Sequence, residues 1–415
     1  MRILYFVQYF PPEKASGLSL VEDMITGFAE YGWEVDVYTT TPTRGVSDEV
    51  RKEYSRRKLE TRCNGKLRIH RMSLYREGEG FVQRTIRYTI FSLMCLWKGL
   101  TEPAEAFFTG NGPPTQGVIG GILKNLTKKK FIFNPQDLFP DSMINAGIIK
   151  KGSKIEKIGR IMERFGYRNA DAIITISEDM RCSILEKGTA AEKVFVVPNW
   201  IDTEIIKPVP REANGLFDEL NMSRDRFYIV YAGNIGYVQG IDSIIEAAKM
   251  LKKEKDIHFV IFGNGSEEHR IRQMIDDYQL ANVSIYPLLN ASRVSEVYSM
   301  GDVSLVTCKP GTGGAGMPSK TWTIMATGTP VLGFFDKPSE FSELLESTRT
   351  GWCVEAGKTY ELCEVILNLY SSRHLCAEYG RNAREYAEVH LAKKKAVREY
   401  IEIINEAMNL QQNNI

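Results

Sequence analysis

The chain has 415 residues, of which 43% are hydrophobic and 25% are charged, and its formal net charge is +1. A chain of this length exceeds what one hydrophobic core usually serves, so we expect two domains. The composition is that of a globular enzyme and excludes a disordered chain. The nearly balanced charge also argues against nucleic acid as a partner.

The cysteines and the first residues bear on where the protein works. The seven cysteines are scattered without a C-x-x-C pair, which indicates neither a disulfide framework nor a zinc site. The apolar start, Met1 to Phe10, has no basic segment before it and runs into two prolines, so it predicts a first strand, not a signal peptide. No apolar run reaches the roughly 18 to 20 residues that a membrane-spanning helix needs. We therefore expect a cytoplasmic protein.

Two series of short apolar runs, separated by helical stretches, indicate parallel sheets covered by helices. The first series consists of Ile3 to Phe10, Val35 to Thr40, Phe131 to Asn134, Ala172 to Ser177 and Val194 to Pro198. The second consists of Tyr228 to Gly233, His258 to Gly263, Val283 to Leu288, Val303 to Thr307 and Pro330 to Phe334. The pattern predicts an α/β fold with two doubly wound halves.

Residues 198–227 separate the two series. They contain three prolines and no clean periodicity, which is typical of an interdomain connection. We place the hinge near Asp202, with one domain at 1–201 and the other at 202–389. Apolar positions at helical spacing over 381–410 predict a terminal helix across the domain junction, so that residues 390–415 pack back on the first domain.

One segment of the first half is unusually apolar. Residues 81–100 read FVQRTIRYTIFSLMCLWKGL, with Arg84, Arg87 and Lys98 at the edges. Two interpretations stand side by side: a helix that faces the core of the first domain, or a helix that lies in a membrane interface. A helix with one face on the core and the other on lipid satisfies both.

Candidate ligand contacts in the first half follow the strands, because ligands of open parallel sheets collect beyond the carboxyl ends of the strands. The loop PPEKASG after the first strand can present backbone N–H groups to an acceptor or a phosphate, and it supplies Glu13, Ser16 and Gly17. It is not G-x-G-x-x-G, which removes the main support for a dinucleotide site. Asp137 either faces the ligand cleft or caps a turn, and Asn199 either binds ligand or holds the hinge.

Candidate contacts in the second half are glycine-rich turns. The turn that contains Gly233, Asn234 and Gln239 suits the close approach of a diphosphate. The turn at Gly263 and Gly265 is either a tight turn or a backbone wall for a nucleotide. The densest feature is the loop 311–319, in which a nest of backbone donors ahead of a helix joins Lys320 to neutralise a diphosphate; its candidate contacts are Gly314, Gly316, Ser319 and Lys320.

In their order and spacing these segments resemble the retaining GT-B glycosyltransferases of family 4, along nearly the whole chain. Among them the chain is most similar to those that make bacterial surface polysaccharides, such as amino-sugar, O-antigen or capsule transferases. The segments that carry the resemblance are ILYFVQYFPPEKASG, FIFNPQDLFPDS, ADAIITISEDM, KVFVVPNWIDTE, YAGNIGYVQGIDSIIEAA, HFVIFGNGSEE and PSKTWTIMATGTPVLG.

The resemblance implies two Rossmann-like domains that face each other across a cleft. It further implies that the second domain holds a nucleotide diphosphate sugar, a UDP-sugar foremost, and the first a polyprenyl-linked or glycan acceptor. Transfer would retain the anomeric configuration, with the leaving diphosphate helping to deprotonate the acceptor. Neither a metal nor a cofactor is expected, and the protein would lie peripherally on the inner face of the cell membrane.

The sequence departs from the family pattern at the donor site. Asn234 and Gln239 stand where many relatives carry an arginine and a lysine, and Ala315 and Thr323 stand where they carry two glutamates. Thr323 takes the position that normally grips the ribose, and Lys320 becomes the chief candidate cation. Together with Asp137 it is our candidate for catalysis.

Two functions remain open: an active, divergent transferase, or a catalytically silent GT-B partner of another transferase. A third, a sugar-nucleotide epimerase, would need a cluster of acids and histidines that we do not find. His70 and His258 lie in strand-like segments, where we expect buried structural roles.

Overall fold

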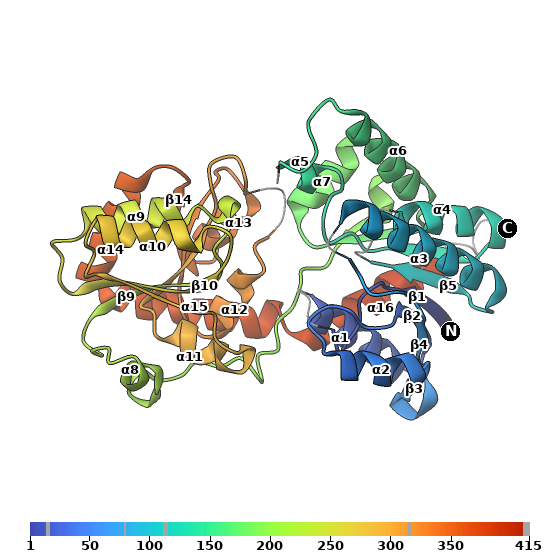
Figure 1. Cartoon of the computed structure of the whole chain (residues 1–415), viewed down its shortest axis with the longest axis horizontal. Helices are drawn as coiled ribbons and strands as arrows, with labels where there is room; N and C mark the ends of the chain where they lie inside the picture. Colours follow the sequence, from blue (N-terminus) through green and yellow to red (C-terminus); the bar gives the residue numbers. More distant parts are fainter. Residues whose placement is uncertain (14–16, 79, 111–114, 146, 314–316, 410–415) are drawn as a thin grey trace. The chain divides into compact units, whose positions relative to one another are not determined.

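The computed structural model describes residues 1–13, 17–78, 80–110, 115–145, 147–313 and 317–409. It divides into two units, one formed by Met1–Asn199 with Lys393–Ile415 and the other by Trp200–Ala392. Each unit contains one β-sheet with helices packed on it (Figure 1). The predicted α/β fold with two largely parallel sheets is therefore confirmed.

The sheet of the first unit has the strand order β3-β4-β2-β1-β5-β6-β7-β8, and all neighbours are parallel except β3 and β4. Its strands are β1 Arg2–Phe6, β2 Glu34–Thr40, β3 Leu59–Arg62, β4 Leu67–Met72, β5 Ala106–Thr109, β6 Lys130–Phe133, β7 Ala172–Thr175 and β8 Val194–Val196. Its helices are α1 Leu18–Glu30, α2 Asp48–Arg56, α3 Phe81–Thr101, α4 Gln116–Thr127, α5 Asp141–Asn145, α6 Lys154–Asn169, α7 Glu178–Glu186 and α16 Lys393–Asn409.

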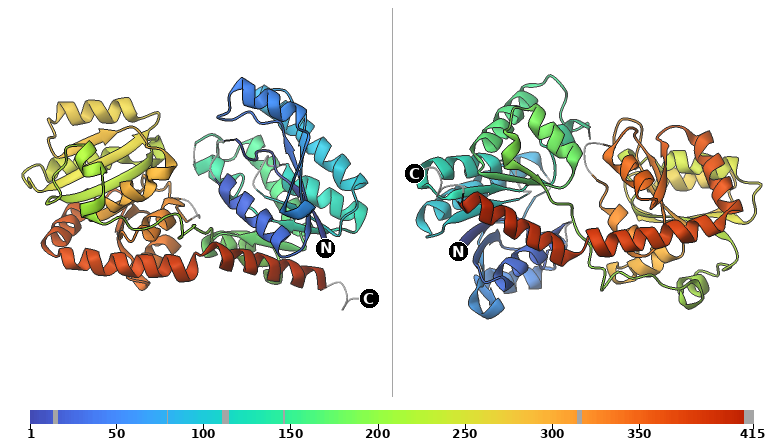
Figure 2. Two further views of the ribbon diagram at one scale, coloured as in Figure 1. Left: turned by 90° about the horizontal axis from the view of Figure 1, so that it is seen from below. Right: turned by 180° about the vertical axis from the view of Figure 1, so that it is seen from behind.

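Alternate residues of β6 face two different helix layers, as the period of two in a strand requires. On one side, the ring of Phe131 packs so closely on α4 that a Cβ on Gly120 would lie 2.1 Å from it. On the other side, Asn134, just after the strand, donates a hydrogen bond of 3.0 Å to the hydroxyl of Tyr400 in α16. Helices α3 and α6 pack against α4, whereas α16 packs beside α1, as Figure 2 shows.

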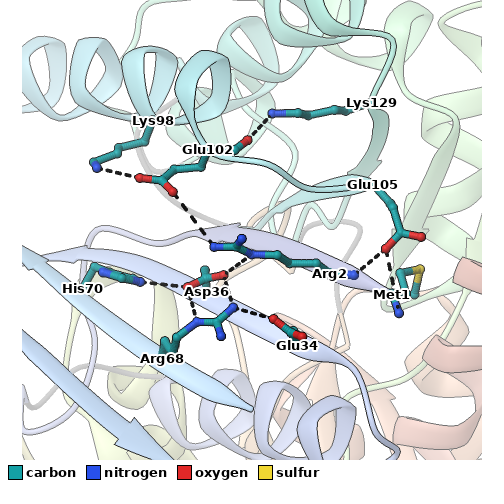
Figure 3. Close-up of polar contacts among 10 residues, drawn as sticks. All are labelled: Met1, Arg2, Glu34, Asp36, Arg68, His70, Lys98, Glu102, Glu105 and Lys129. Carbon is teal, nitrogen blue, oxygen red and sulfur yellow. Dashed lines mark hydrogen bonds and ion pairs between the residues drawn. The ribbon is translucent and has the colours of Figure 1, made fainter. Parts of the chain in front are cut away.

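A buried carboxylate ties the strands of the first sheet together. Asp36 on β2 is fully buried and accepts hydrogen bonds from Arg2 on β1 at 2.7 Å and from Arg68 on β4 at 2.8 Å (Figure 3). His70 on β4 lies 2.8 Å from the same carboxylate and stacks on the ring of Tyr38. Burial alone would raise the pKa of Asp36, but these hydrogen bonds outweigh it and hold the pKa well below its ordinary value. His70 thus has the structural role expected for it, but its ring is half-buried and not buried.

One face of helix α3 packs on the core of the first unit, as one of the two interpretations of its sequence predicted. Arg87, Phe91 and Cys95 are buried, and Arg87 donates a 2.8 Å hydrogen bond to the Thr40 hydroxyl. The opposite face presents an apolar stripe to solvent, formed by Val82, Ile86, Leu93, Trp97 and Leu100. No helix in the described part of the chain is long and apolar enough to cross a membrane. Contact of the stripe with lipid stays a prediction.

The sheet of the second unit is entirely parallel, with the order β11-β10-β9-β12-β13-β14. Its strands are β9 Phe227–Asn234, β10 Ile257–Asn264, β11 Val283–Tyr286, β12 Val303–Thr307, β13 Val331–Phe335 and β14 Gly351–Glu355. Its helices are α8 Leu216–Glu219, α9 Ile241–Met250, α10 Glu268–Asp277, α11 Val294–Ser299, α12 Lys320–Ala326, α13 Glu340–Ser347, α14 Thr359–Ser371 and α15 Arg373–His390. Counted from its own first strand, this is the 3-2-1-4-5-6 order of the dinucleotide-binding fold.

Two expectations from the sequence were wrong in detail. The single terminal helix expected over 381–410 is two helices, α15 and α16. They break at Leu391, whose carbonyl accepts a 3.0 Å hydrogen bond from the Ile201 N–H group and so leaves the helical pattern. The expected strand series also omitted β3, β4, β5 and β14. β4 was recognised only as a strand-like segment around His70, and the other three are either polar or too brief to stand out as apolar runs.

Candidate functional site

In the second unit, the candidate site lies at the point where the strand order reverses, between β9 and β12. Ligands of doubly wound sheets bind beyond the carboxyl ends of the strands at this point. The loops after the two strands are joined there: Lys309 N–H donates to the Val238 carbonyl at 2.9 Å, and the Thr307 hydroxyl donates to the Gln239 carbonyl. Gly240 has a φ of 62°, and a Cβ on it would lie 3.1 Å from the backbone of Cys308. This turn therefore requires glycine.

Lys320, the first residue of α12, extends its ammonium group back to the end of β9. Its Nζ lies 4.1 Å from the centre of the Tyr231 ring, and a Cβ on Gly233 would lie 2.9 Å from the same atom. Burial lowers the pKa of the Lys320 ammonium to about 8. No carboxylate of the described residues forms an ion pair with it. The structure thus places a partly desolvated cation at the strand-order reversal, where an anion would supply the missing partner.

Asn234 and Gln239 lie together in the turn after β9. The side-chain amide of Asn234 donates to the side-chain oxygen Oε1 of Gln239 at 3.3 Å, and the Asn234 backbone carbonyl accepts from the Tyr231 hydroxyl at 2.6 Å. A Cβ on Gly236 would lie within 2.7 Å of both amide side chains. The turn therefore carries a neutral pair of amides, and their contact with a donor stays a prediction.

Gly263 and Gly265 have a structural explanation. A Cβ on Gly263 would lie 2.4 Å from the Gly233 carbonyl oxygen, and one on Gly265 would lie 2.2 Å from the Ile235 carbonyl oxygen. Glycine is needed at both positions because the end of β10 packs directly on the backbone at the end of β9 and just after it. Neither glycine has a positive φ, so close packing and not a tight turn explains them, and contact with a nucleotide stays a prediction.

Asp336 binds the backbone of the glycine-rich loop before α12. The sequence analysis did not single out this residue. The N–H groups of Gly311 and Gly313 donate to the two carboxylate oxygens of Asp336, each at 2.8 Å. The part of the expected backbone nest at these two residues is therefore already occupied. Gly314 and Gly316 lie outside the described residues. Asp336 directly follows β13. Its position at the end of a strand is the feature of the sequence from which it could have been chosen as a candidate.

Two further residues of this region complete the expected set. Ser319 is exposed ahead of α12 and makes no side-chain cap, and Thr323 is half-buried one turn into the helix.

Lys309, two residues after β12, is a cation that sequence reasoning missed. Its Nζ lies 3.6 Å from Asp242 and 3.6 Å from the centre of the Tyr237 ring. Unlike Lys320, this lysine already has a carboxylate partner.

In the first unit, Glu13 anchors loops and is not presented to solvent. Its side chain is buried and accepts hydrogen bonds from the N–H groups of Phe10, Thr43 and Arg44 at 3.1, 2.7 and 3.1 Å. These contacts favour a structural role in joining the loops after β1 and β2. Gly17, directly before α1, has a φ of 76°, a conformation that favours glycine. Ser16 lies outside the described residues.

Asp137 does not have the contacts of a capping residue. It lies in a bend after β6, four residues before α5 begins, and it forms no hydrogen bond with any described residue. Its carboxylate reaches solvent, yet the surrounding protein desolvates it enough to raise its pKa. The bend is anchored beside it, because Gln136 donates a 3.0 Å hydrogen bond to Asn134. Asp137 is therefore available to a ligand.

The neighbouring Asp141 is structural. It starts α5 and accepts hydrogen bonds from Arg160 at 2.5 Å and from Lys187 at 2.8 Å. Burial would raise the pKa of Asp141, but these two cations outweigh it and lower the pKa. The two carboxylates of this loop thus differ: one is ion-paired and the other is not.

Other polar groups in the first unit were not found from the sequence. Gln8, after β1, is buried and its side-chain amide has no hydrogen-bond partner among the described residues, and the same holds for the hydroxyl of Thr109 at the end of β5. β1 and β5 flank the point where this sheet reverses its order. The side-chain oxygen of Asn199 is likewise buried without a partner in the described part of the chain. Its role as ligand or hinge residue stays open.

His258 on β10 has the buried structural role expected for it. Its ring lies 2.9 Å from the Ser284 hydroxyl, and burial lowers its pKa to about 4. Within the described ranges, no three His, Cys, Asp or Glu side chains form a group that could hold a metal ion. The expectation that no metal or cofactor takes part stays a prediction.

Comparison with known proteins assigns a family to each half of the chain. Residues 19–200 match the model of the glycosyl transferase 4-like domain, and residues 215–386 match that of glycosyl transferases group 1. The chain is 28% identical over 416 residues to the putative colanic acid biosynthesis glycosyl transferase WcaI of Escherichia coli K12, covering 97% of this chain and 99% of that protein.

Two solved structures share the fold. Sucrose-phosphate synthase from Thermosynechococcus elongatus matches with a TM-score of 0.75 at 15% identity, over 98% of both chains. Anabaena HepE, solved in complex with UDP, matches with a TM-score of 0.72 at 14% identity, over 98% of this chain and 100% of HepE.

Proposed function

The chain belongs to the GT-B glycosyltransferases, with a family-4-like first domain and a group 1 second domain, and on this basis we propose a specific reaction. It moves a sugar from a nucleotide diphosphate sugar, foremost a UDP-sugar, to a polyprenyl-linked or glycan acceptor. The anomeric configuration is retained. The product enters a bacterial surface polysaccharide such as O-antigen, capsule or exopolysaccharide.

The observation that carries the proposal is Lys320. A lysine whose pKa is lowered to about 8 by burial, with no carboxylate partner among the described residues, is unfavourable in the free protein. A diphosphate at the end of β9 would remove that cost, because its charge would sit against the desolvated ammonium. In the reaction the same contact stabilises the leaving diphosphate, whose negative charge grows as the glycosidic bond breaks.

The relatives support the class of donor and product. WcaI is named as a putative glycosyl transferase of colanic acid biosynthesis, which supports a place in the synthesis of a bacterial surface polysaccharide. HepE was solved with UDP, which supports a uridine nucleotide as the first donor to test.

For the acceptor, the proposal assigns the first unit, with Asp137 addressing the acceptor hydroxyl or the reacting sugar. Its support is that this carboxylate is accessible and makes no hydrogen bond with a described residue, whereas Asp141 nearby is ion-paired. The apolar stripe on α3 supports a peripheral position on the inner face of the membrane, where a lipid-linked acceptor would be met.

The experiment is a measurement of nucleoside diphosphate release. The purified chain is given a panel of UDP-, GDP- and dTDP-sugars, with and without a polyprenyl-diphosphate-linked sugar. We expect one donor to release its diphosphate faster when the acceptor is present. Retention is then read from the anomeric configuration of the product by NMR. Absence of release across the whole panel would reject the proposed reaction.

The catalytically silent alternative has one observation in its favour. Asn234 and Gln239 form a neutral pair with each other where many transferases of this type carry two cations. This alternative predicts that UDP binds and raises the unfolding temperature although no donor is turned over. Copurification of a second transferase would favour it further, whereas release of a nucleoside diphosphate would exclude it.

A further inference from the structure

Helix α6 and the loop before it expose isoleucines to solvent. The exposed fractions are 67% for Ile148, 58% for Ile155, 58% for Ile158 and 69% for Ile161. The last three follow one another at a spacing of three residues, so they form a strip along one side of the helix. A strip of large apolar side chains on the outside of a helix calls for an explanation that packing of the core does not supply.

The inner side of α6 explains why the isoleucines face outward. The residues it buries are Gly159, Glu163, Gly166 and Tyr167. At Gly166 the helix lies so close to α4 that a Cβ would be 3.1 Å from the Cα of Gly117. No side chain fits at this point of the crossing, although the ring of Phe165 packs against Gly121 of α4. Of the four residues that α6 buries, only Tyr167 is large and aromatic, and the isoleucines face outward.

The same surface is basic. Six exposed side chains lie among the isoleucines or next to them, and none forms an ion pair with a described residue: Lys150, Lys151, Lys154, Lys157, Arg164 and Arg168. We call these six and the four isoleucines the α6 surface. Its charge is positive and uncompensated.

The acidic side chains of the segment bind groups of the unit itself. Residues 147–169 contain two carboxylates, Glu156 and Glu163. Glu156 accepts from the Gly152 N–H group at 2.5 Å, and Glu163 accepts from Lys187 at 2.6 Å. Both are thus used within the unit and do not neutralise the α6 surface.

We propose that the α6 surface binds the anionic headgroups of a phospholipid bilayer, with its isoleucines inserted at the level of the upper acyl chains. Cations attract the anionic lipid, and each contributes about 1 kcal/mol near such a surface. The isoleucines distinguish a bilayer from an acidic protein or polymer, which would be bound by the charges alone.

The neighbouring helices extend the same face. α4 packs between α3 and α6, and Figure 1 shows the three helices as one layer over the sheet. Leu126 on α4 is 65% exposed, and the apolar stripe of α3 includes Trp97, which is 60% exposed. The α6 surface adds to this layer the charges that the α3 stripe lacks, so lipid composition controls attachment. Lipid binding is measured without donor or acceptor and is therefore separate from sugar transfer.

The test is flotation of the full chain with vesicles of phosphatidylcholine alone or mixed equally with phosphatidylglycerol. We expect binding to the mixed vesicles, little to the neutral ones, and weaker binding as salt rises. The double variant Lys154→Gln/Lys157→Gln should bind the mixed vesicles on the order of 30-fold more weakly, from about 1 kcal/mol for each cation and tenfold for every 1.4 kcal/mol. The matched control is Lys253→Gln/Lys255→Gln, two exposed lysines of the second unit, which should bind like the wild type.

A second variant, Ile155→Ser/Ile158→Ser, tests insertion. It should also weaken binding to mixed vesicles, while its unfolding temperature and UDP binding stay at the wild-type values because both positions are exposed. The proposal is overturned if the wild type does not bind the mixed vesicles, or if the control variant loses as much binding as the α6 variant. Wild-type binding by the isoleucine variant would also overturn it, because the surface would then recognise charge alone, as for an acidic protein.

Discussion

Replacing Lys320 with methionine removes the cation at the end of β9 and keeps an unbranched apolar chain in its place. We expect the change to have opposite effects on stability and on nucleotide binding. Burial lowers the pKa of Lys320 from its ordinary 10.5 to about 8. At 1.36 kcal/mol per pKa unit, holding the charge in the folded protein costs at most about 3.4 kcal/mol.

The pH dependence follows from the direction of this shift. Below about pH 8 the lysine is protonated in both the folded and the unfolded chain, so its full cost is present at pH 7. Between about pH 8 and its ordinary pKa the folded chain loses the proton first, and the cost disappears. Lys320→Met should therefore be more stable than the wild type at pH 7, by an amount that shrinks as pH rises through this window.

UDP binding should change in the other direction. Loss of a charged contact to the diphosphate is worth about 1.5 to 3 kcal/mol, so affinity should fall by about tenfold to a hundredfold. In the wild type, affinity should also decline above about pH 8, where the free lysine loses its proton, and this decline should be absent from the variant.

Titration calorimetry with UDP and urea unfolding at several pH values measure both effects, with Lys253→Met as the control at an exposed lysine of the same unit. An unchanged dissociation constant for UDP would refute the assignment of Lys320 to the diphosphate. A variant less stable than the wild type at pH 7 would refute the claim that the buried charge is costly.

Three further predictions concern the first unit. Asp137→Asn should lower kcat by about tenfold or more with donor KM and unfolding free energy near wild type, in steady-state kinetics and urea unfolding, since only its reaction contacts are lost; an equal loss of stability would indicate a capping role. Asp36→Asn should cost about 1.5 to 3 kcal/mol in urea unfolding at pH 7, because it removes the charged acceptor that the half-buried Arg2 and Arg68 share. The difference in unfolding free energy between the variant and the wild type should shrink as pH falls below the ordinary aspartate pKa, since the pKa of Asp36 is lowered in the folded chain. A difference that stays constant with pH would contradict this assignment of the Asp36 charge. Leu93→Glu/Trp97→Glu should reduce vesicle flotation without unfolding the chain, as both positions are exposed; unfolding would place the stripe in the core.

The two sheets could be predicted because most of their strands are apolar runs buried on both faces. Tyr228 to Gly233 and Val303 to Thr307 are such runs, and both are central strands in the structure. β3 could not be found in this way, because the edge segment LETR is mostly polar and exposed. Its pairing with β4 is set by its partner and not by its own composition.

The site could be located from the sequence but its contacts could not be assigned. Lys320 and the turn at Gly233 meet at the expected strand ends, because the chain order of strands in a doubly wound sheet fixes where their loops converge. Gly263 and Gly265 are needed because the backbone of a neighbouring strand lies close to them. The hydrogen bond from Gly311 to Asp336 joins residues 25 positions apart. Such contacts depend on tertiary packing, which local sequence patterns do not contain.

The buried side of α6 also depends on tertiary packing and cannot be predicted from local sequence patterns. Its isoleucines look like a core face when read from periodicity, and only the close approach of Gly166 to α4 shows that the core lies on the opposite side. Glycine on the buried side of a helix is the local signal from which this orientation could have been inferred.

The most direct test of the central claim is nucleoside diphosphate release measured side by side for the wild type and Lys320→Met, across the sugar-nucleotide panel with the lipid-linked acceptor. The proposed reaction predicts release from at least one donor by the wild type, and at least about tenfold slower release by the variant at the same donor concentration. Release at equal rates would contradict the role of Lys320, and release by neither protein would contradict sugar transfer itself.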